Sequence, residues 1–300
     1  MNKLKAWIIA FRLRTLPLSL SSIILGGALA YADKPFRWQI FLLALVTTLF
    51  LQILSNLAND YGDYSHGLDN QERMGPQRSV QSGAISPQEM KTGILVFILL
   101  SLASGLWLIL SSTGMTISVE GIFFLVLGLL AIGAAIKYTI GKHPYGYYGL
   151  GDLFVFLFFG LTGVLGSYYL ITHHLQADLL LPASALGCLS TGVLNLNNMR
   201  DLESDRKNGK RTLAVLLGPR FSRYYHLALL TLAILFSLVY IILNYHSPWQ
   251  FIFLIIIPPL TENIRAVFRA PSPSILDPLL KKLALTSLLY ALAFGIGMLF

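Results

Sequence analysis

Residues 38–69 read WQIFLLALVTTLFLQILSNLANDYGDYSHGLD, an apolar run that ends in a cluster of acidic residues. A helix that spans a membrane needs about 20 mostly apolar residues. The first part of the stretch therefore predicts a membrane helix over 38–58. Asp60, Asp63 and Asp69 follow at the end of that helix, although only 12% of the residues in the chain are charged.

Apolar runs of this kind recur along the chain, which is 55% hydrophobic and has a mean hydropathy of +0.66. A soluble domain usually has about 25% charged residues, so the composition excludes a soluble enzyme. A chain in lipid must satisfy its backbone hydrogen bonds internally, and no segment alternates like a barrel strand. We expect a single domain over 1–300 that is all-α, a polytopic bundle of nine membrane helices. The predicted segments are 16–32, 38–58, 92–110, 118–140, 150–172, 179–199, 224–244, 249–268 and 281–300.

The basic residues predict the orientation of this bundle. Lys and Arg concentrate in cytoplasmic loops of membrane proteins. With the N-terminus inside, nine helices place 20 of the 22 Lys and Arg on the cytoplasmic side, and only Lys34 and Arg37 outside. We therefore expect a cytoplasmic N-terminus, an external C-terminus and a location in the inner (cytoplasmic) membrane. The net charge of +8 then needs no nucleic-acid partner. Arg12 and Arg14 interrupt the first apolar run, which favours a retained segment over a cleaved signal peptide.

Two polar segments, both on the predicted cytoplasmic side, resemble each other. The first is NDYGDYSHGLD from Asn59, and the second is NNMRDLESDRKNGKRTLAVLLG from Asn197. Each contains an Asn and an Asp four positions apart, a spacing that places both side chains on one helix face. A further acid follows in each, and then glycine and basic residues. These further acids are Asp69 and Asp205.

Carboxylate and amide oxygens suit Mg²⁺, which binds few protein ligands and keeps waters or substrate phosphates. The neighbouring Arg and Lys side chains match phosphate oxygens. The mixture predicts a site for Mg²⁺ and a diphosphate, and the sequence has neither a Walker-type loop nor a dinucleotide-binding fingerprint. A cation-coupled membrane transporter is the alternative from a different class. The acids lie at one end of the predicted helices rather than near the midplane, which favours the enzyme.

The two polar segments resemble the two Asp-rich motifs of the UbiA superfamily of intramembrane prenyltransferases. Three further stretches are similar to the branch of that superfamily that prenylates 1,4-dihydroxy-2-naphthoate in menaquinone biosynthesis. They are RLRTLPLSL (12–20), DNQERMGPQRSVQSGAIS (69–86) and GLGDLFVFLFFGLTGVLGSYY (149–169). A branch that prenylates 4-hydroxybenzoate or another aromatic acceptor is the alternative, and GPQRSVQSG resembles the naphthoate branch.

The resemblance implies nine membrane helices around a central cavity that cytoplasmic loops cap. It implies transfer of a polyprenyl group from an all-trans polyprenyl diphosphate to 1,4-dihydroxy-2-naphthoate, with loss of CO₂ and diphosphate, giving demethylmenaquinol. Carried over by motif, the Mg²⁺ ligands would be Asn59, Asp63, Asp69, Asn197, Asp201 and Asp205. Of these, Asn59, Asp63, Asn197 and Asp201 would be catalytic. The candidates for diphosphate binding are Arg73, Arg78, Lys137 and Arg206. This chain departs from the branch at two positions: the branch more often has Glu where this chain has Asp152, and Asp where this chain has Glu72.

Other residues carry expectations of their own. We expect Cys188 to be buried, Gly26 and Gly27 to serve helix packing, and the aromatic run from Phe154 to face lipid or pack. Asp60 lies about 100° from Asn59 around a helix, so we expect it to tolerate substitution best. The remaining candidates are the tyrosines near the cytoplasmic loops for cation stabilisation and two histidines for a base: Tyr61, Tyr64, Tyr138, Tyr145, Tyr147, Tyr148, His66 and His143.

Overall fold

The computed structural model describes residues 2–33, 35–67, 78–116, 118–270 and 272–300, and the regular structure in them is helical. Within these ranges, nine segments are long and apolar enough to cross a membrane, as predicted. Their bounds are Lys3–Ala32, Trp38–Ser65, Pro87–Ser112, Val119–Lys137, Gly151–Thr172, Ala177–Arg200, Leu213–Leu243, Pro248–Arg269 and Pro273–Gly297. The all-α prediction is therefore confirmed.

Several of these segments are interrupted helices. The elements, in chain order, are α1 (Lys3–Phe11), α2 (Leu16–Ala32), α3 (Trp38–Ser65), α4 (Pro87–Ser112), α5 (Val119–Lys137), α6 (Gly151–Val155), η3 (Phe156–Thr162), α7 (Gly163–Thr172), α8 (Leu180–Arg200), α9 (Leu202–Lys207), α10 (Leu213–Leu243), η5 (Pro248–Ile256), α11 (Ile257–Arg269) and α12 (Leu276–Gly297). Arg12, with a φ of 49°, separates α1 from α2. The η3 segment is a π-helix, a form found mostly as short insertions at functional sites.

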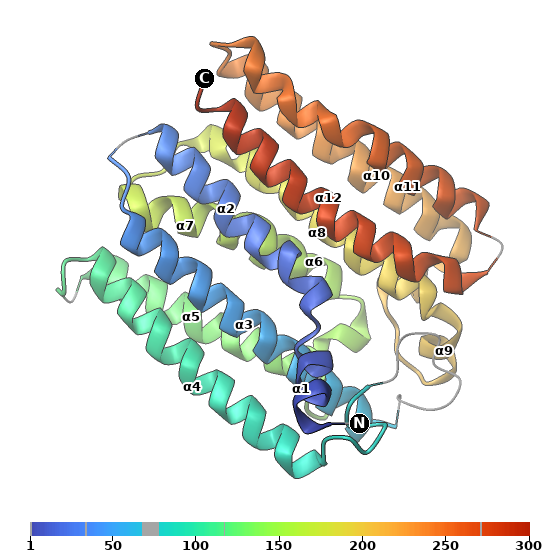
Figure 1. The fold of residues 1–300 in the computed structure, drawn as a ribbon. Helices are drawn as coiled ribbons and strands as arrows, with labels where there is room; N and C mark the ends of the chain where they lie inside the picture. The colour runs from blue at the N-terminus through green and yellow to red at the C-terminus, as the bar shows by residue number, and fades with distance from the viewer. Residues whose placement is uncertain (1, 34, 68–77, 117, 271) are drawn as a thin grey trace.

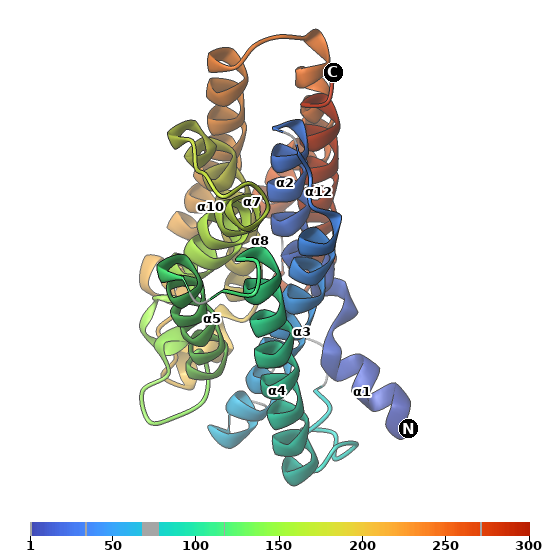
Figure 2. The ribbon, with the colours of Figure 1, turned by 90° about the vertical axis from the view of Figure 1, so that its left-hand side faces the viewer.

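The helix α8 is the central element of the bundle, and 78% of its most apolar window is buried. It packs along α10 and α12, and α2 lies between α12 and α7 (Figure 1). The pair α3 and α4 forms the other side of the molecule with α5. The chain termini lie at opposite ends, with α1 and α9 at the end that holds the N-terminus (Figures 1 and 2).

Local signals in the sequence explain where the helices begin. At α4, Ser86 and Glu89 form a capping box: the Ser86 hydroxyl accepts from Glu89 N at 3.2 Å, and Glu89 accepts from Ser86 N at 2.8 Å. At α10 the Thr212 hydroxyl accepts from Val215 N at 3.4 Å and so caps the helix. This helix was predicted to begin near 224 and instead begins at Leu213, because the kink at Gly218 (φ 76°) joins two helical pieces. The second polar connection is correspondingly shorter.

The glycine pair on α2 serves close packing, as expected. A β-carbon on Gly26 would lie 2.1 Å from Ser167 Oγ and 2.4 Å from the Val164 carbonyl oxygen of α7. One on Gly27 would lie 2.4 Å from the Phe41 ring. Small residues let helix backbones approach in membrane bundles. Cys188 is buried in the apolar core, as expected.

Candidate active site

An elongated cavity of about 390 Å³ runs through the bundle. At one end it is lined by polar residues of the two motif segments and of the N-terminal turn: Arg12, Arg14, Asn59, Asp63, Arg78, Asn197 and Lys210. Its walls are apolar further along, and Leu108, Phe124 and Leu170 line it towards the opposite ends of α4, α5 and α7. A cavity with one charged end and an apolar length suits a ligand with a polar head and a hydrocarbon tail.

The first motif forms one side of the charged end. Asp63 lies in the last turns of α3, is 5% exposed, and accepts hydrogen bonds from Arg78 Nη2 and, at 2.9 Å, from the Tyr147 hydroxyl. Arg78 Nη1 also donates to the carbonyl oxygen of Asn59. The Asn59 side-chain oxygen is buried and has no hydrogen-bond partner among the described residues. The predicted i,i+4 pair of Asn59 and Asp63 therefore faces the cavity, and Arg78, a candidate for diphosphate binding, lies beside it.

The second motif forms the facing side, at the junction of α8 and α9. Asn197 lines the cavity from α8. Asp201 receives two hydrogen bonds from Arg200, at 2.9 Å and 2.7 Å. Asp205 on α9 is paired with Lys210, whose Nζ lies 3.7 Å from Asp205 Oδ1. The backbone bonds from Asp201 N to Asn197 O and from Asp205 N to Asp201 O continue the helical spacing through the junction.

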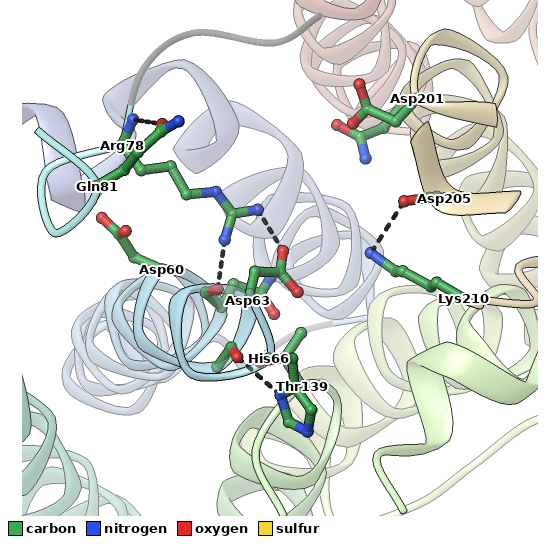
Figure 3. Close-up of polar contacts among 12 residues, drawn as sticks. Asp60, Asp63, His66, Arg78, Gln81, Thr139, Asp201, Asp205 and Lys210 are labelled. Carbon is green, nitrogen blue, oxygen red and sulfur yellow. Dashed lines mark hydrogen bonds and ion pairs between the residues drawn. The ribbon is translucent and has the colours of Figure 1, made fainter. Parts of the chain in front are cut away.

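Figure 3 shows the two sides together: Asp63 and Arg78 lie opposite Asp201, Asp205 and Lys210, and the charged groups point into the space between them. Three carboxylates and two amides from segments far apart in the sequence thus lie at this end of the bundle, and three of these five groups line the cavity itself: Asn59, Asp63 and Asn197. Each of the three carboxylates has a cationic partner: Arg78 for Asp63, Arg200 for Asp201 and Lys210 for Asp205. Like-charged groups at such close quarters require neighbouring positive charge.

The donor set fits Mg²⁺ that is shared with a diphosphate. Among the described residues, no three His, Cys, Asp or Glu side chains lie close enough to enclose a metal ion alone. Mg²⁺ sites of the phosphate-transfer type use one or two carboxylates, with substrate oxygens and waters completing the shell. The unpartnered Asn59 oxygen is a hard donor that such an ion or its water would satisfy.

Aromatic rings line the cavity next to its charged end. Tyr145 and Phe154 stack with centroids 4.1 Å apart, and Phe154 is followed by Phe158 at 6.1 Å. All three line the cavity, as does Tyr138. Within the aromatic run, Phe154 and Phe158 therefore pack, as expected, and also line the cavity, which the sequence did not indicate. The π-helical turns of η3 change the face that each residue presents, so Phe158 and Phe159 both reach the cavity.

The tyrosines at this end stay in the neutral form. Burial raises the pKa of Tyr138, and the nearby charges of Asp152, Asp63 and Asp205 raise it further. Burial also raises the pKa of Tyr147, together with the charge of Asp63 and the hydrogen bond to it. Tyr147 is therefore a hydrogen-bond donor to Asp63 over the whole physiological pH range, and its ring lies under Lys210 Nζ at 5.2 Å.

Several predicted residues lie away from the cavity. Arg206 is exposed and pairs with Glu203 at 3.5 Å, and Lys137 is exposed on the outside of α5, so the structure does not bring these two to the diphosphate site. Both were candidates because they are basic, and a basic residue near the site can still point to solvent. Of the candidate bases, His66 faces the carbonyl oxygens of Gly62 and Gly141, and His143 contacts the Tyr148 hydroxyl. Neither histidine lines the cavity.

Asp60 also differs from its expectation. It is 2% exposed, and its Oδ2 accepts from the backbone N of Ser79, which follows the first motif loop. Asp60 thus contacts the returning chain, and this buried contact argues against the expectation that it tolerates substitution best. Asp69, Glu72 and Arg73 lie outside the described residues. Asp152 is buried at the start of α6 and does not line the cavity.

Other residues of the charged end were not predicted from the sequence. Lys210 lines the cavity and pairs with Asp205, five positions earlier. Arg12 and Arg14 line it from the turn before α2. Arg200 contacts Asp201 although the two are adjacent in sequence. The only available signal was the repetition of basic residues around both motifs, which indicates phosphate binding but not which side chain performs it.

Comparison with known proteins identifies the family. A model of the UbiA prenyltransferase family matches residues 19–274. The chain belongs to the UbiA prenyltransferase family. Within this family it is 45% identical to a 1,4-dihydroxy-2-naphthoate octaprenyltransferase of Haemophilus influenzae, over 99% of this chain and 97% of the relative.

Solved structures of UbiA homologues have the same fold. The apo structure of a homologue from Aeropyrum pernix matches with a TM-score of 0.69 at 17% identity, over 95% of this chain and 97% of that one. A homologue from Archaeoglobus fulgidus bound to GPP and Mg²⁺ matches with a TM-score of 0.62 at 18% identity, over 97% and 99%. At these identities the likeness establishes the family fold, and the roles of individual side chains rest on the geometry above.

Proposed function

We propose that this chain transfers a polyprenyl group from an all-trans polyprenyl diphosphate to 1,4-dihydroxy-2-naphthoate, with loss of diphosphate and CO₂, in menaquinone biosynthesis. The observation that carries the proposal is the cavity, whose charged end joins both Asp-rich segments and whose apolar length accommodates a prenyl tail. The acceptor is supported by the similarity to the Haemophilus influenzae octaprenyltransferase along almost the whole chain.

Mg²⁺ would be held by Asn59 and Asp63 on one side and by Asn197, Asp201 and Asp205 on the other. When bound, it would draw electron density from the leaving diphosphate. Arg78 and Lys210 line the same end and are placed to neutralise diphosphate oxygens. The archaeal homologue of the same fold is a structure bound to GPP and Mg²⁺.

In the reaction, the bond between the allylic carbon and the diphosphate oxygen breaks, and its electron pair leaves with the diphosphate. The electron-rich ring of the acceptor attacks the allylic carbocation-like centre and forms the new C–C bond. The carboxylate at the attacked carbon leaves as CO₂, and the electron pair of that bond restores aromaticity. The rings of Tyr138, Tyr145, Phe154 and Phe158 exclude water and offer aromatic faces to the cationic centre.

We further propose that the charged end faces the cytoplasm in the inner (cytoplasmic) membrane. The bias of Lys and Arg towards this end of the bundle supports that orientation. Both motifs, the N-terminus and α1 would then be cytoplasmic, and the C-terminus external. A cysteine-accessibility experiment on a variant without Cys188 tests the arrangement: a thiol introduced at Ser65 should react with a membrane-impermeant reagent only in inverted vesicles.

The acceptor is tested with purified protein in detergent, Mg²⁺ and all-trans octaprenyl diphosphate. We expect a prenylated naphthalene product and one CO₂ per product when 1,4-dihydroxy-2-naphthoate is supplied. 4-Hydroxybenzoate should give no product. Product from the benzoate alone would contradict the proposed acceptor and would leave the family assignment intact.

A further inference from the structure

Arg200 is the largest fully buried side chain of the described residues, with 2% of its surface exposed. It is the last residue of α8, and its guanidinium donates hydrogen bonds to three residues. Nε and Nη2 bind the two carboxylate oxygens of Asp201, Nη2 also reaches Asn197 Oδ1 at 2.9 Å, and Nη1 binds Asp277. One guanidinium thus touches two of the three residues of the second motif that are proposed to hold Mg²⁺, Asn197 and Asp201.

Adjacent residues on a helix point about 100° apart, so a contact between Arg200 and Asp201 needs a local change of the backbone. The change is present: α8 ends at Arg200, Asp201 has φ −93° and ψ 6°, and α9 begins at Leu202. The carboxylate of Asp201 can therefore meet the planar fork of Arg200 in a two-bond arrangement. Such a paired arrangement fixes orientation as well as distance.

The far side of Arg200 is held by α12. Asp277 lies in the first turn of that helix, and it also accepts from Arg14 Nη1 at 3.2 Å. Arg14, which shares the Asp277 carboxylate with Arg200, also lines the cavity. The four side chains form an alternating row of charges, in the order Arg14, Asp277, Arg200 and Asp201, which links the N-terminal turn, the last helix and the second motif.

From this geometry we infer that Asp277 is a positioning residue for the second motif, acting through Arg200. The inference rests on the proposed function, because it concerns the Mg²⁺-diphosphate site of that reaction. A buried guanidinium needs compensating carboxylates. With Asp277 in place, Arg200 is anchored on the side away from the site and holds Asn197 and Asp201 in one geometry. Without it, the guanidinium has Asp201 as its one remaining carboxylate among the partners above, and competes with a metal ion for that group.

The test uses full-length protein in detergent, with Mg²⁺ and inorganic diphosphate as the probe. The readout is the Mg²⁺ concentration that gives half of the ligand-induced rise in Tm at a fixed diphosphate concentration. Replacing a residue that orients metal ligands typically weakens metal binding by about 10- to 100-fold. We expect Asp277→Asn to raise that Mg²⁺ concentration by about tenfold or more, and Asp277→Glu to raise it by a smaller factor.

The matched control is Glu262→Gln on α11, which removes an exposed carboxylate that pairs with Lys282 of α12 at 2.8 Å. It should leave the Mg²⁺ dependence unchanged. An unchanged dependence in Asp277→Asn, even with a lower Tm at every Mg²⁺ concentration, would overturn the inference and leave Asp277 a purely structural residue. If Asp277→Asn does not fold, the same measurement is made on Asp277→Glu. A Mg²⁺ dependence of Asp277→Glu equal to that of the wild-type protein would then overturn the inference. Absence of any Mg²⁺-dependent response in the wild-type protein would contradict the proposed function instead.

Discussion

Tyr147→Phe is the most informative single change at the charged end of the cavity. It removes one hydroxyl, which donates to Asp63 Oδ1 at 2.9 Å, and keeps the ring that lies under Lys210 and against His66. A hydrogen bond to a charged group is worth about 1.5–3 kcal/mol. Since about 1.4 kcal/mol corresponds to a factor of ten in rate, kcat/KM should fall roughly 10- to 150-fold if Asp63 must be held in this orientation for the reaction.

The assay is prenyl transfer with purified Tyr147→Phe protein, and the adjacent Tyr148→Phe is the matched control. Tyr148 is exposed and its hydroxyl contacts His143 rather than an acid, so its loss should change the rate less than about twofold. The raised pKa of Tyr147 means that its phenol stays protonated up to and beyond its ordinary pKa near 10. The pH profile below 10 should therefore keep its shape in the variant. A rate for Tyr147→Phe equal to that of Tyr148→Phe would refute the role assigned to this hydrogen bond.

Three further predictions follow from the described contacts. Gly160→Ala should lower the free energy of unfolding by about 1–3 kcal/mol, because the new β-carbon would lie 2.6 Å from Gly187 Cα and 2.8 Å from the Ala183 carbonyl oxygen of α8. The measurement is thermal unfolding, and the control is Gly166→Ala, whose β-carbon would meet the Phe124 ring at 3.7 Å. Asp60→Ala should lower the free energy of unfolding by about 1–3 kcal/mol, because it leaves the Ser79 N–H without its acceptor; a Tm equal to that of the wild type would restore the expectation from sequence. Arg206→Gln and Lys137→Gln should leave KM for the prenyl diphosphate within about twofold, whereas Arg78→Gln, inside the cavity, should raise it at least about tenfold. Equal effects of the three on KM would count against the placement of the diphosphate.

The elements that were predictable from sequence are those that depend on local patterns. Nine apolar runs gave nine spans, and the spacing of Asn59 and Asp63 placed both on one face of α3. The second motif kept its helical spacing because backbone hydrogen bonds continue through Asp201. These features follow from periodicity and from the length of an apolar run.

The partners of the charged groups were not predictable in this way. The contact of Arg200 with Asp201 depends on the break between α8 and α9, and its contact with Asp277 joins positions 77 residues apart. Which rings of the aromatic run from Phe154 point into the cavity depends on the π-helical turns of η3. Rings that line an apolar cavity and rings that face lipid have the same composition, so hydropathy alone does not separate them. The beginning of α10 was missed because the kink at Gly218 interrupts its pattern.

The central claim is that the two Asp-rich segments together hold one Mg²⁺-bound diphosphate. Its most direct test is the rate of prenyl transfer by Asp63→Asn and Asp201→Asn, measured across a Mg²⁺ titration, with the exposed Glu203→Gln as the control. Metal-assisted charge stabilisation is worth several kcal/mol, so each Asn variant should lose roughly 100-fold or more at every Mg²⁺ concentration, and the control should lose little. Near-normal rates at saturating Mg²⁺ in either Asn variant would contradict the claim.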